Sequence, residues 1–254
     1  MPFFSIIIPS YNSGNNLIKS LESIFLQTFH DYEVWVIDGG STDNTKQIIE
    51  AFKIENKKLF YISEKDEGIY DAMNKGIDLA KGEWLYFMGS DDVLMDSFVL
   101  EKIFNILSKS DIDYLYGNVL FKGQNIIYDG IFNIDKLLFE KNICHQSIFF
   151  KNSLFSKIGY FNLKYKLWAD WDFNIRCFKS NCIKLSYCDV TIAVYNDISG
   201  QSSKNEDEIF LRELPLYYLN KIALLENKIG YYNQYIKKNR IKSIAKILLG
   251  RNIF

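Results

Sequence analysis

Two adjacent carboxylates, Asp91 and Asp92, follow the apolar run of residues 84–88 after Gly89 and Ser90. Neighbouring carboxylates at the end of a buried strand repel each other and lose hydration, unless a cation or a hydroxyl-rich ligand meets them. A divalent cation that carries a diphosphate satisfies both needs, because hard cations prefer carboxylate oxygens and keep open positions for phosphate oxygens. The pair therefore predicts a nucleotide-diphosphate substrate.

Two further polar clusters follow apolar runs in the first half of the chain. Residues 10–12, Ser-Tyr-Asn, come after the run 3–9, and residues 38–40, Asp-Gly-Gly, come after the run 34–37. In open parallel sheets, ligands bind at the carboxyl ends of the strands. We therefore expect the three clusters to meet at one edge of a sheet and to form a single ligand site.

The elements that would position these clusters alternate between strand and helix. Strands are expected at 3–9, 34–37, 59–62 and 84–88. Helices are expected where apolar residues recur at helical spacing, from Leu17 to Phe25, after the capping oxygens of residues 41–43 through Phe52, and from Ile69 to Ala80. This alternation predicts an α/β fold with a mostly parallel, Rossmann-like sheet and helices on both faces.

The second half of the chain is less regular. It is expected to hold a hairpin at 114–121 and 125–129, a strand at 147–150, a helix at 170–178 and two strands at 183–187 and 190–195. From Glu206 onward the pattern becomes helical.

The composition narrows the class of protein. The chain has 254 residues and 48% hydrophobic residues, enough for a large core. The net charge of -1 provides no general attraction to nucleic acid. The 4 cysteines form no CxxC pair, which argues against a zinc site and for reduced thiols. The N-terminus lacks the features of a signal peptide, and no apolar run reaches the length of a membrane span, so a cytoplasmic location is expected.

These segments together resemble the family 2 inverting glycosyltransferases with a GT-A fold. The resemblance runs from Phe4 to about Gly200 and rests on IIIPSYN at 6–12, VIDGGSTD at 36–43, DEGIYDAMNKG at 66–76, GEW at 82–84, SDD at 90–92 and WADWD at 168–172. It implies a hexosyltransferase that moves a sugar from a nucleotide sugar, with inversion, in the synthesis of bacterial O-antigen, capsule or exopolysaccharide. The donor implied is a UDP-hexose or UDP-N-acetylhexosamine.

The resemblance also implies roles for residues at the three clusters. Asp92 is expected to bind Mn²⁺ or Mg²⁺ that bridges the diphosphate, and Asp91 to accept hydrogen bonds from the ribose. Asp38 is expected to accept a hydrogen bond from the nucleobase, with Pro9 and Tyr11 lining the base pocket. For Asp38 the alternative is turn chemistry before two glycines, and for Tyr11 it is an ordinary exposed aromatic side chain.

Four acidic or basic residues outside the clusters complete the expected site. Asp66 is placed near the nucleotide and donor sugar, or else caps the following helix. His145 is placed near the donor or acceptor diphosphate, or else has a structural role. Asp170 is the expected catalytic base, although Ala169 stands where many relatives carry an acid. Asp172 is its rival, and the two side chains point about 200° apart on a helix, so only one can face the cleft.

The expected domain organisation follows from this resemblance. Residues 1–204 would form the catalytic domain, with a nucleotide-binding half at about 1–117 and an acceptor half at about 118–204. Residues 199–203 are expected to close over the diphosphate. Residues 205–254 would form a helical extension.

The end of that extension, residues 231–254, has a basic face beside an apolar one, which is typical of a helix on an anionic membrane. An undecaprenyl-diphosphate-linked saccharide, or another glycan, would be the acceptor there. The alternative is a helix packed on the catalytic domain.

Two other functions compete with this interpretation. A dinucleotide-dependent oxidoreductase would also place an acid, Asp38, after its second strand, but the loop after the first strand lacks GxGxxG. A non-catalytic nucleotide-sugar-binding or assembly protein of the same fold is favoured by the missing acid at Ala169.

Overall fold

The computed structural model of the chain describes residues 1–198 and 206–217, together with residues 219, 226, 227, 229, 230, 234 and 237. Two compact units are present, Met1–Phe210 and Leu211–Phe254. All described residues of the second unit are helical. None of the helices in the described part of the chain combines the length and the apolarity needed to cross a membrane. The expected closing loop at 199–203 lies outside the described residues, as does the expected membrane helix apart from residues 234 and 237.

The first half of the first unit contains four parallel strands. They are β1 (Phe4–Ser10), β2 (Tyr32–Asp38), β3 (Leu59–Ser63) and β4 (Trp84–Phe87), in the order β3-β2-β1-β4. In their register Ser10 pairs with Asp38, and Asp38 pairs with Ser63. The carboxyl ends of the strands are therefore aligned, as the polar clusters after the apolar runs predicted.

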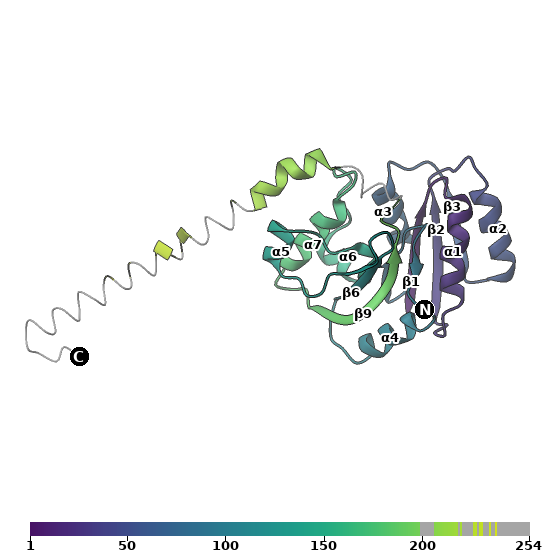
Figure 1. Cartoon of the computed structure of the whole chain (residues 1–254), viewed down its shortest axis with the longest axis horizontal. Coiled ribbons are helices and arrows are strands. Elements are labelled where there is room, and N and C mark those ends of the chain that lie inside the picture. Colours follow the sequence, from purple (N-terminus) through teal and green to yellow (C-terminus); the bar gives the residue numbers. More distant parts are fainter. Residues whose placement is uncertain are drawn as a thin grey trace, which may run out of the picture. The chain divides into compact units, whose positions relative to one another are not determined.

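Helices cover both faces of these strands (Figure 1). Helices α1 (Gly14–Phe25) and α2 (Thr45–Glu55) lie on one side, and α3 (Ile69–Leu79) lies on the other. Successive side chains of a strand point to opposite faces. Ile6 and Ile8 accordingly belong to one apolar cluster with Leu17 of α1, while Ile7 faces α3. Burying each of these side chains stabilises the fold by roughly 1.5–3 kcal/mol.

Gly76 allows α3 to approach the sheet closely. A Cβ atom added to Gly76 would lie 2.4 Å from Cγ2 of Ile7. The close contact fixes the depth at which α3 packs, and with it the position of Tyr70 in the first turn of the helix.

The second half of the unit extends the sheet with antiparallel and parallel pairs. Its strands are β5 (Val93–Leu94), β6 (Tyr114–Phe121), β7 (Ile126–Tyr128), β8 (Ile148–Lys151) and β9 (Leu185–Tyr195). The complete order is β3-β2-β1-β4-β8-β6-β9-β5, with β7 paired to β6. The α/β class is confirmed, with the parallel part confined to the first four strands and to the β6–β9 pair.

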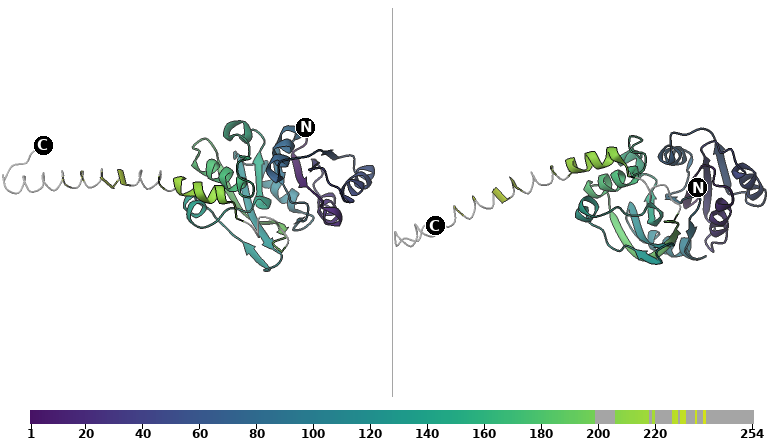
Figure 2. Two further views of the ribbon diagram at one scale, coloured as in Figure 1. Left: turned by 90° about the horizontal axis from the view of Figure 1, so that it is seen from above. Right: turned by 45° about the horizontal axis from the view of Figure 1, so that its top comes forward.

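Strand β9 corrects one prediction. The two strands expected at 183–187 and 190–195 form one strand that runs beside β6, as both views of Figure 2 show. The register shifts opposite Gly117, where an added Cβ would lie 2.4 Å from the carbonyl oxygen of Val190. A bulge of this kind bends a strand without ending it, so the break in the sequence pattern is an irregularity within one strand.

The remaining helical elements surround the second half of the sheet. They are α4 (Val99–Leu107), α5 (Ile134–Phe139), the 3-10 turn η1 (His145–Ser147), α6 (Leu154–Ile158) and α7 (Ala169–Lys179). The turn η1 precedes β8, which pairs with β4, and α7 begins one residue before Asp170. The expected His145 and Asp170 are therefore both at the starts of helical turns.

Candidate active site

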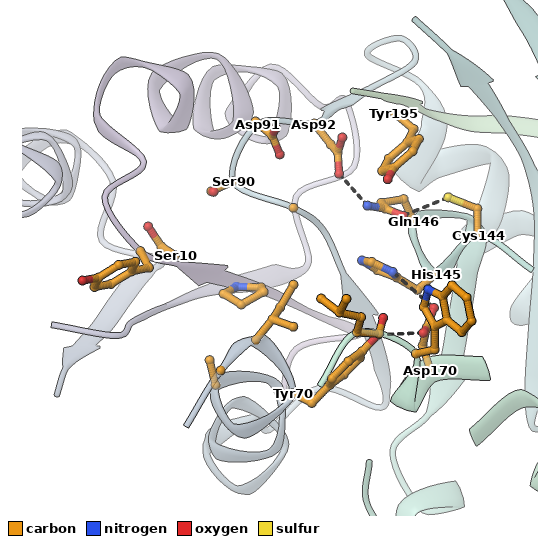
Figure 3. Close-up of a pocket in the computed structure, with 18 of the residues that line it drawn as sticks. Ser10, Tyr70, Ser90, Asp91, Asp92, Cys144, His145, Gln146, Asp170 and Tyr195 are labelled. Atoms are coloured by element: carbon orange, nitrogen blue, oxygen red, sulfur yellow. Dashed lines mark hydrogen bonds and ion pairs between the residues drawn. The ribbon is translucent and has the colours of Figure 1, made fainter. Parts of the chain in front are cut away.

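A cavity of about 640 Å³ is lined by residues from both halves of the first unit. It lies where β1 and β4 end, and the residues after these strands form part of its wall (Figure 3). Asp38 and Asp172 do not belong to the described residues that line the cavity. Seven of the nine residues predicted from the sequence do line it: Pro9, Tyr11, Asp66, Asp91, Asp92, His145 and Asp170.

Asp92 is almost fully buried at the cavity wall, with 1% of its surface exposed. The side-chain amide of Gln146 donates to its Oδ2 at 2.7 Å, and the backbone N–H of Asn196 donates to its Oδ1 at 2.8 Å. Burial nevertheless raises the pKa of Asp92 to about 6, because two hydrogen bonds do not replace the lost hydration of a carboxylate.

Asn196 binds both acids of the pair. Its side-chain amide donates to Oδ2 of Asp91 at 2.9 Å, while its backbone N–H holds Asp92. Strand β9 ends one residue earlier, at Tyr195. The residue that follows β9 therefore orients the two carboxylates that follow β4.

The acidic pair fits a divalent cation. A Cβ atom added to Gly89 would lie 2.4 Å from Oδ2 of Asp92 and 3.3 Å from Oδ1 of Asp91, so the two carboxylates converge on space that a side chain would fill. Within the described residues, no group of three or more His, Cys, Asp or Glu forms a self-sufficient metal site. Two carboxylates leave coordination positions for phosphate oxygens and water, which is how Mg²⁺ is commonly held with phosphate substrates.

Asp170 lies in the first turn of α7 and contacts three neighbours. The Tyr70 hydroxyl donates to its Oδ1 at 2.7 Å, and the Asn142 side-chain amide donates to its Oδ2 at 2.9 Å. Nδ1 of His145 lies 3.6 Å from the same Oδ2. Figure 3 shows Gln146 and His145 between Asp92 and Asp170, so the acidic pair and the candidate base occupy separate parts of one cavity.

Asp172 points away from the cavity. Its Oδ2 accepts a hydrogen bond from Nε of Arg176 at 2.8 Å, and only 4% of its side chain is exposed. Of the two acids, therefore, only Asp170 lines the cavity. The catalytic role of Asp170 stays a prediction.

His145 lines the cavity with its imidazole largely buried. Nε2 of the ring has no hydrogen-bond partner within the part of the chain that the structure describes, while Nδ1 faces Asp170. A buried ring nitrogen without a partner is uncommon. The imidazole is consequently oriented by packing and by Asp170.

Only two of the three residues expected to contact the nucleobase line the cavity. Pro9 and Tyr11 line it, and Tyr11 is 62% exposed, so its ring is available to a ligand. Asp38 instead lies buried beneath the loop, where Ser63 donates to its Oδ2 at 2.6 Å and the backbone N–H of Ser41 donates to the same oxygen at 3.2 Å. A base contact through Asp38, which stays a prediction, would have to compete with these two serines.

Asp66 lies at the cavity wall just before α3, and its expected contact with the nucleotide and donor sugar stays a prediction. Its carboxylate lines the cavity, and its Oδ1 accepts a hydrogen bond from the backbone N–H of Gly68 at the start of α3. It packs over Gly39, where a Cβ atom would lie 2.4 Å from Oδ2 of Asp66. Burial raises the pKa of Asp66 above its usual value.

The sequence interpretation missed several residues that hold the acids. Tyr70 lies within the segment 66–76 that carries the resemblance, and Gln146 follows the predicted His145, so the sequence held a signal for both. Asn142 and Asn196 belong neither to a segment that carries the resemblance nor to a periodic apolar segment, so nothing in the sequence indicated their contacts with the acids. Five aromatic residues that also line the cavity were not singled out either: Phe121, Tyr128, Trp168, Trp171 and Tyr195.

The family is decided by a comparison with protein-family models. The model described as Glycosyl transferase family 2 matches residues 5–173. The chain belongs to glycosyl transferase family 2. The resemblance stated from the sequence segments is thereby confirmed, and the chain is a glycosyltransferase.

Relatives agree with this family. The PGL/p-HBAD biosynthesis glycosyltransferase of Mycobacterium tuberculosis is 43% identical over 217 residues, which are 85% of each chain. Glycosyltransferase GlyG of Streptococcus pneumoniae is 24% identical over 245 residues, 95% of this chain and 72% of GlyG.

Solved structures confirm the GT-A fold. The first 349 residues of Staphylococcus aureus TarS in complex with UDP-GlcNAc match with a TM-score of 0.67 at 21% identity, over 81% of this chain and 61% of that chain. A mannosyltransferase from Pyrobaculum calidifontis, in complex with GDP-Man and Mn²⁺, matches with a TM-score of 0.62 at 16% identity.

Proposed function

We propose that this family 2 glycosyltransferase moves a hexose or N-acetylhexosamine from a UDP-sugar, with inversion, to a hydroxyl of a glycan or lipid-linked saccharide in bacterial surface polysaccharide synthesis. The observation that carries the proposal is the placement of an acidic pair, Asp91 and Asp92, and a separate carboxylate, Asp170, on one cavity. The binding of UDP-GlcNAc by TarS, which shares the fold, supports a UDP-sugar as the donor.

The donor diphosphate would lie against the acidic pair. When bound to Asp92, Mn²⁺ or Mg²⁺ would neutralise the negative charge that grows on the leaving nucleotide, and Asp91 would accept hydrogen bonds from the ribose. The convergence of the two carboxylates on the space beside Gly89 supports this position. Tyr11, exposed at the cavity mouth, would pack against the nucleobase.

Asp170 would be the base that activates the acceptor. In a single displacement, the acceptor oxygen forms a bond to the anomeric carbon while the bond from that carbon to the diphosphate oxygen breaks. The hydroxyl proton passes to Asp170, and the electron pair leaves with the nucleoside diphosphate. Attack from the face opposite the leaving group inverts the anomeric configuration, and no covalent enzyme intermediate forms.

A panel of UDP-sugars tests the donor. Each sugar is added with Mn²⁺, first in a thermal-shift assay, because a ligand that binds the folded state raises its stability. A stabilising donor is then used in transfer or hydrolysis assays, with the anomeric configuration of the product read by NMR. Stabilisation by GDP-sugars and not by UDP-sugars would refute the donor class, and retention of configuration would refute the mechanism.

Two matched variants test the base. Asp170→Asn should lower kcat by at least about 100-fold, because general base catalysis contributes at least that much, and should leave UDP affinity unchanged. Asp172→Asn is the control. If Asp172→Asn alone abolishes turnover, the base is misassigned, and if neither wild-type nor variants turn over any donor that they bind, the chain is a nucleotide-sugar-binding protein.

The sequence of residues 231–254 supports a peripheral location on the inner face of the cytoplasmic membrane. Each Lys or Arg near an anionic surface contributes about 1 kcal/mol, and this segment contains six such residues and no acid. Flotation with anionic liposomes should therefore retain the full chain and lose a chain that ends at Gly230. Equal flotation of the two chains would refute the role of this segment.

A further inference from the structure

Each oxygen of the Asp170 carboxylate accepts a hydrogen bond from a different donor, Oδ1 from buried Tyr70 and Oδ2 from half-buried Asn142. Oδ2 of Asp170 ends a chain of three hydrogen bonds, which we call the amide chain. Tyr114 donates to Oδ1 of Asn174 at 2.8 Å, Nδ2 of Asn174 donates to Oδ1 of Asn142 at 2.8 Å, and Nδ2 of Asn142 donates to Asp170 at 2.9 Å.

Helix α7 supplies two members of this arrangement. Asp170 and Asn174 are four residues apart, so they lie on one face of the helix, one turn above the other. Asn174 is 1% exposed and Tyr114 is fully buried, and neither lines the cavity. They reach the reaction site only through Asn142, which does line the cavity.

The direction of the amide chain depends on the charge of Asp170. An ionised carboxylate only accepts hydrogen bonds, so Asn142 must present its NH₂ group to it and its oxygen to Asn174. Asn174 must then present its oxygen to the Tyr114 hydroxyl. With Asp170 ionised, every bond of the chain has a donor and an acceptor.

The other carboxylate oxygen is reached by Tyr70. The Tyr70 hydroxyl oxygen lies 2.7 Å from Oδ1 of Asp170 and 2.6 Å from the carbonyl oxygen of Leu167. One hydroxyl hydrogen serves one of these two acceptors at a time. It is drawn to the carboxylate while Asp170 is ionised, since hydrogen bonds to charged groups are the stronger ones, and it is free to turn to Leu167 once Asp170 has taken a proton.

We propose that Tyr70, Asn142 and Asn174 are positioning residues that hold the carboxylate of Asp170 oriented toward the acceptor hydroxyl. This inference rests on the proposed role of Asp170 as the base. The donors occupy one direction on each oxygen, and each carboxylate oxygen has a second lone pair. The second lone pairs remain for the acceptor proton on the cavity side.

Other titratable groups around Asp170 set the background of its pH dependence. They are Tyr70 of α3, Tyr114 of β6, Tyr128 of β7, Cys144, His145 of η1 and Asp207, which accepts from the backbone N–H of Leu167. Nδ1 of His145 lies 3.6 Å from Oδ2 of Asp170.

The test compares Tyr70→Phe and Asn174→Leu with Tyr160→Phe. Tyr160 donates to Asp78 at the surface and provides the matched control for loss of a tyrosine hydroxyl. In Tyr70→Phe, kcat should fall about 10- to 100-fold, the loss expected from a hydrogen bond to a charged group, with the KM of the donor within about twofold. The acidic limb of the kcat profile should move to higher pH, since a carboxylate that loses a donor holds its proton more tightly.

Asn174→Leu should also lower kcat and move the acidic limb of the kcat profile to higher pH, although residue 174 touches neither substrate nor cavity. Circular dichroism and UDP affinity show whether Asn174→Leu folds. If it does not, Tyr114→Phe, which removes only the terminal hydroxyl of the amide chain, takes its place in the test. The proposal is overturned if kcat and the acidic limb are unchanged in Tyr70→Phe and in the folded amide-chain variant, or if only KM changes. Activity retained in Asp170→Asn would instead refute the base itself.

Discussion

Replacing Asp92 by asparagine should stabilise the folded protein at neutral pH while it removes transfer activity. The carboxylate is buried, and its pKa is raised from 3.8 to about 6. Asparagine has nearly the same shape and keeps an oxygen that can accept from the backbone N–H of Asn196, which holds Oδ1 at 2.8 Å. The variant thus removes the charge and keeps the shape, while Gln146, which donates to Oδ2 in wild type, must turn its amide to present oxygen to the new NH₂ group.

The sign of the effect follows from the direction of the shift. An acid whose pKa is higher in the folded state contributes stability below its unfolded pKa, and that contribution is lost as the pH rises through the folded pKa. A difference of about two units between unfolded and folded states corresponds to about 3 kcal/mol at pH 7.5. At pH 4.5 the same two pKa values correspond to a destabilisation of the folded state by about 1 kcal/mol.

Urea denaturation of both proteins at the two pH values measures this difference. Asp92→Asn should exceed wild type by up to about 3 kcal/mol at pH 7.5 and by about 1 kcal/mol at pH 4.5. Mn²⁺ with UDP should raise the melting temperature of wild type and not that of the variant. A variant that is no more stable than wild type at pH 7.5, or a difference that does not change with pH, would refute the reasoning.

Asp96→Asn is the control of opposite sign. Lys102 donates to Oδ2 of Asp96 at 2.7 Å, and this hydrogen bond lowers the pKa of the Asp96 carboxyl. A lowered pKa contributes stability above the unfolded pKa that is lost as the pH falls. Asp96→Asn should therefore be less stable than wild type at pH 7.5, with a difference that shrinks toward pH 4.

Three further substitutions test individual contacts. Asp172→Asn should lower the free energy of unfolding by about 2 kcal/mol, since Arg176 loses a charged acceptor, while kcat stays within about threefold of wild type. Gly82→Ala should cost about 1–3 kcal/mol in urea denaturation, because its Cβ would lie 2.5 Å from the backbone nitrogen of Ser5; equal stability would contradict this contact. Tyr11→Ala should raise the KM of the donor about tenfold without changing kcat, as expected for a lost base–aromatic stack, while Tyr11→Phe should leave both unchanged.

The first four strands were predictable because their signals are local. Each is a short apolar run that ends in a polar cluster, and the intervening helices show an apolar stripe. These features are fixed by neighbouring residues, so β1 to β4 lie within one or two residues of their expected bounds. Asp170 was the predicted base and Asp172 its rival, because helix geometry shows that only one of the two acids can face the cavity and not which one.

The second half was less predictable because its pairings are long-range. Nothing in the sequence of β8 indicates that it pairs with β4 on one side and β6 on the other. The same is true of the partners of Asp92. Gln146 and Asn196 reach it from positions 54 and 104 residues away, and such contacts leave no periodic signal.

Asp38 shows a different limit of sequence reasoning. Its position after β2 was expected, and the structure places it there. Its side chain, however, binds Ser41 and Ser63 beneath the loop. A carboxylate at a strand end can stabilise the loop or contact a ligand, and the residue type is the same in both cases.

The late position of β9 has a consequence for synthesis of the chain. Strands β1 to β4 are complete by residue 87, whereas β9, which pairs with both β6 and β5, ends at residue 195. A nascent chain or fragment that ends before residue 185 therefore has the donor-side strands but leaves the edge of β6 open, and exposed strand edges promote aggregation. In that fragment the Asp91–Asp92 pair also lacks Asn196. The order of synthesis thus delays the assembly of the acidic pair until nearly 200 residues have been made. Soluble N-terminal fragments should therefore not bind Mn²⁺ with UDP, and they cannot replace the whole catalytic unit in an assay.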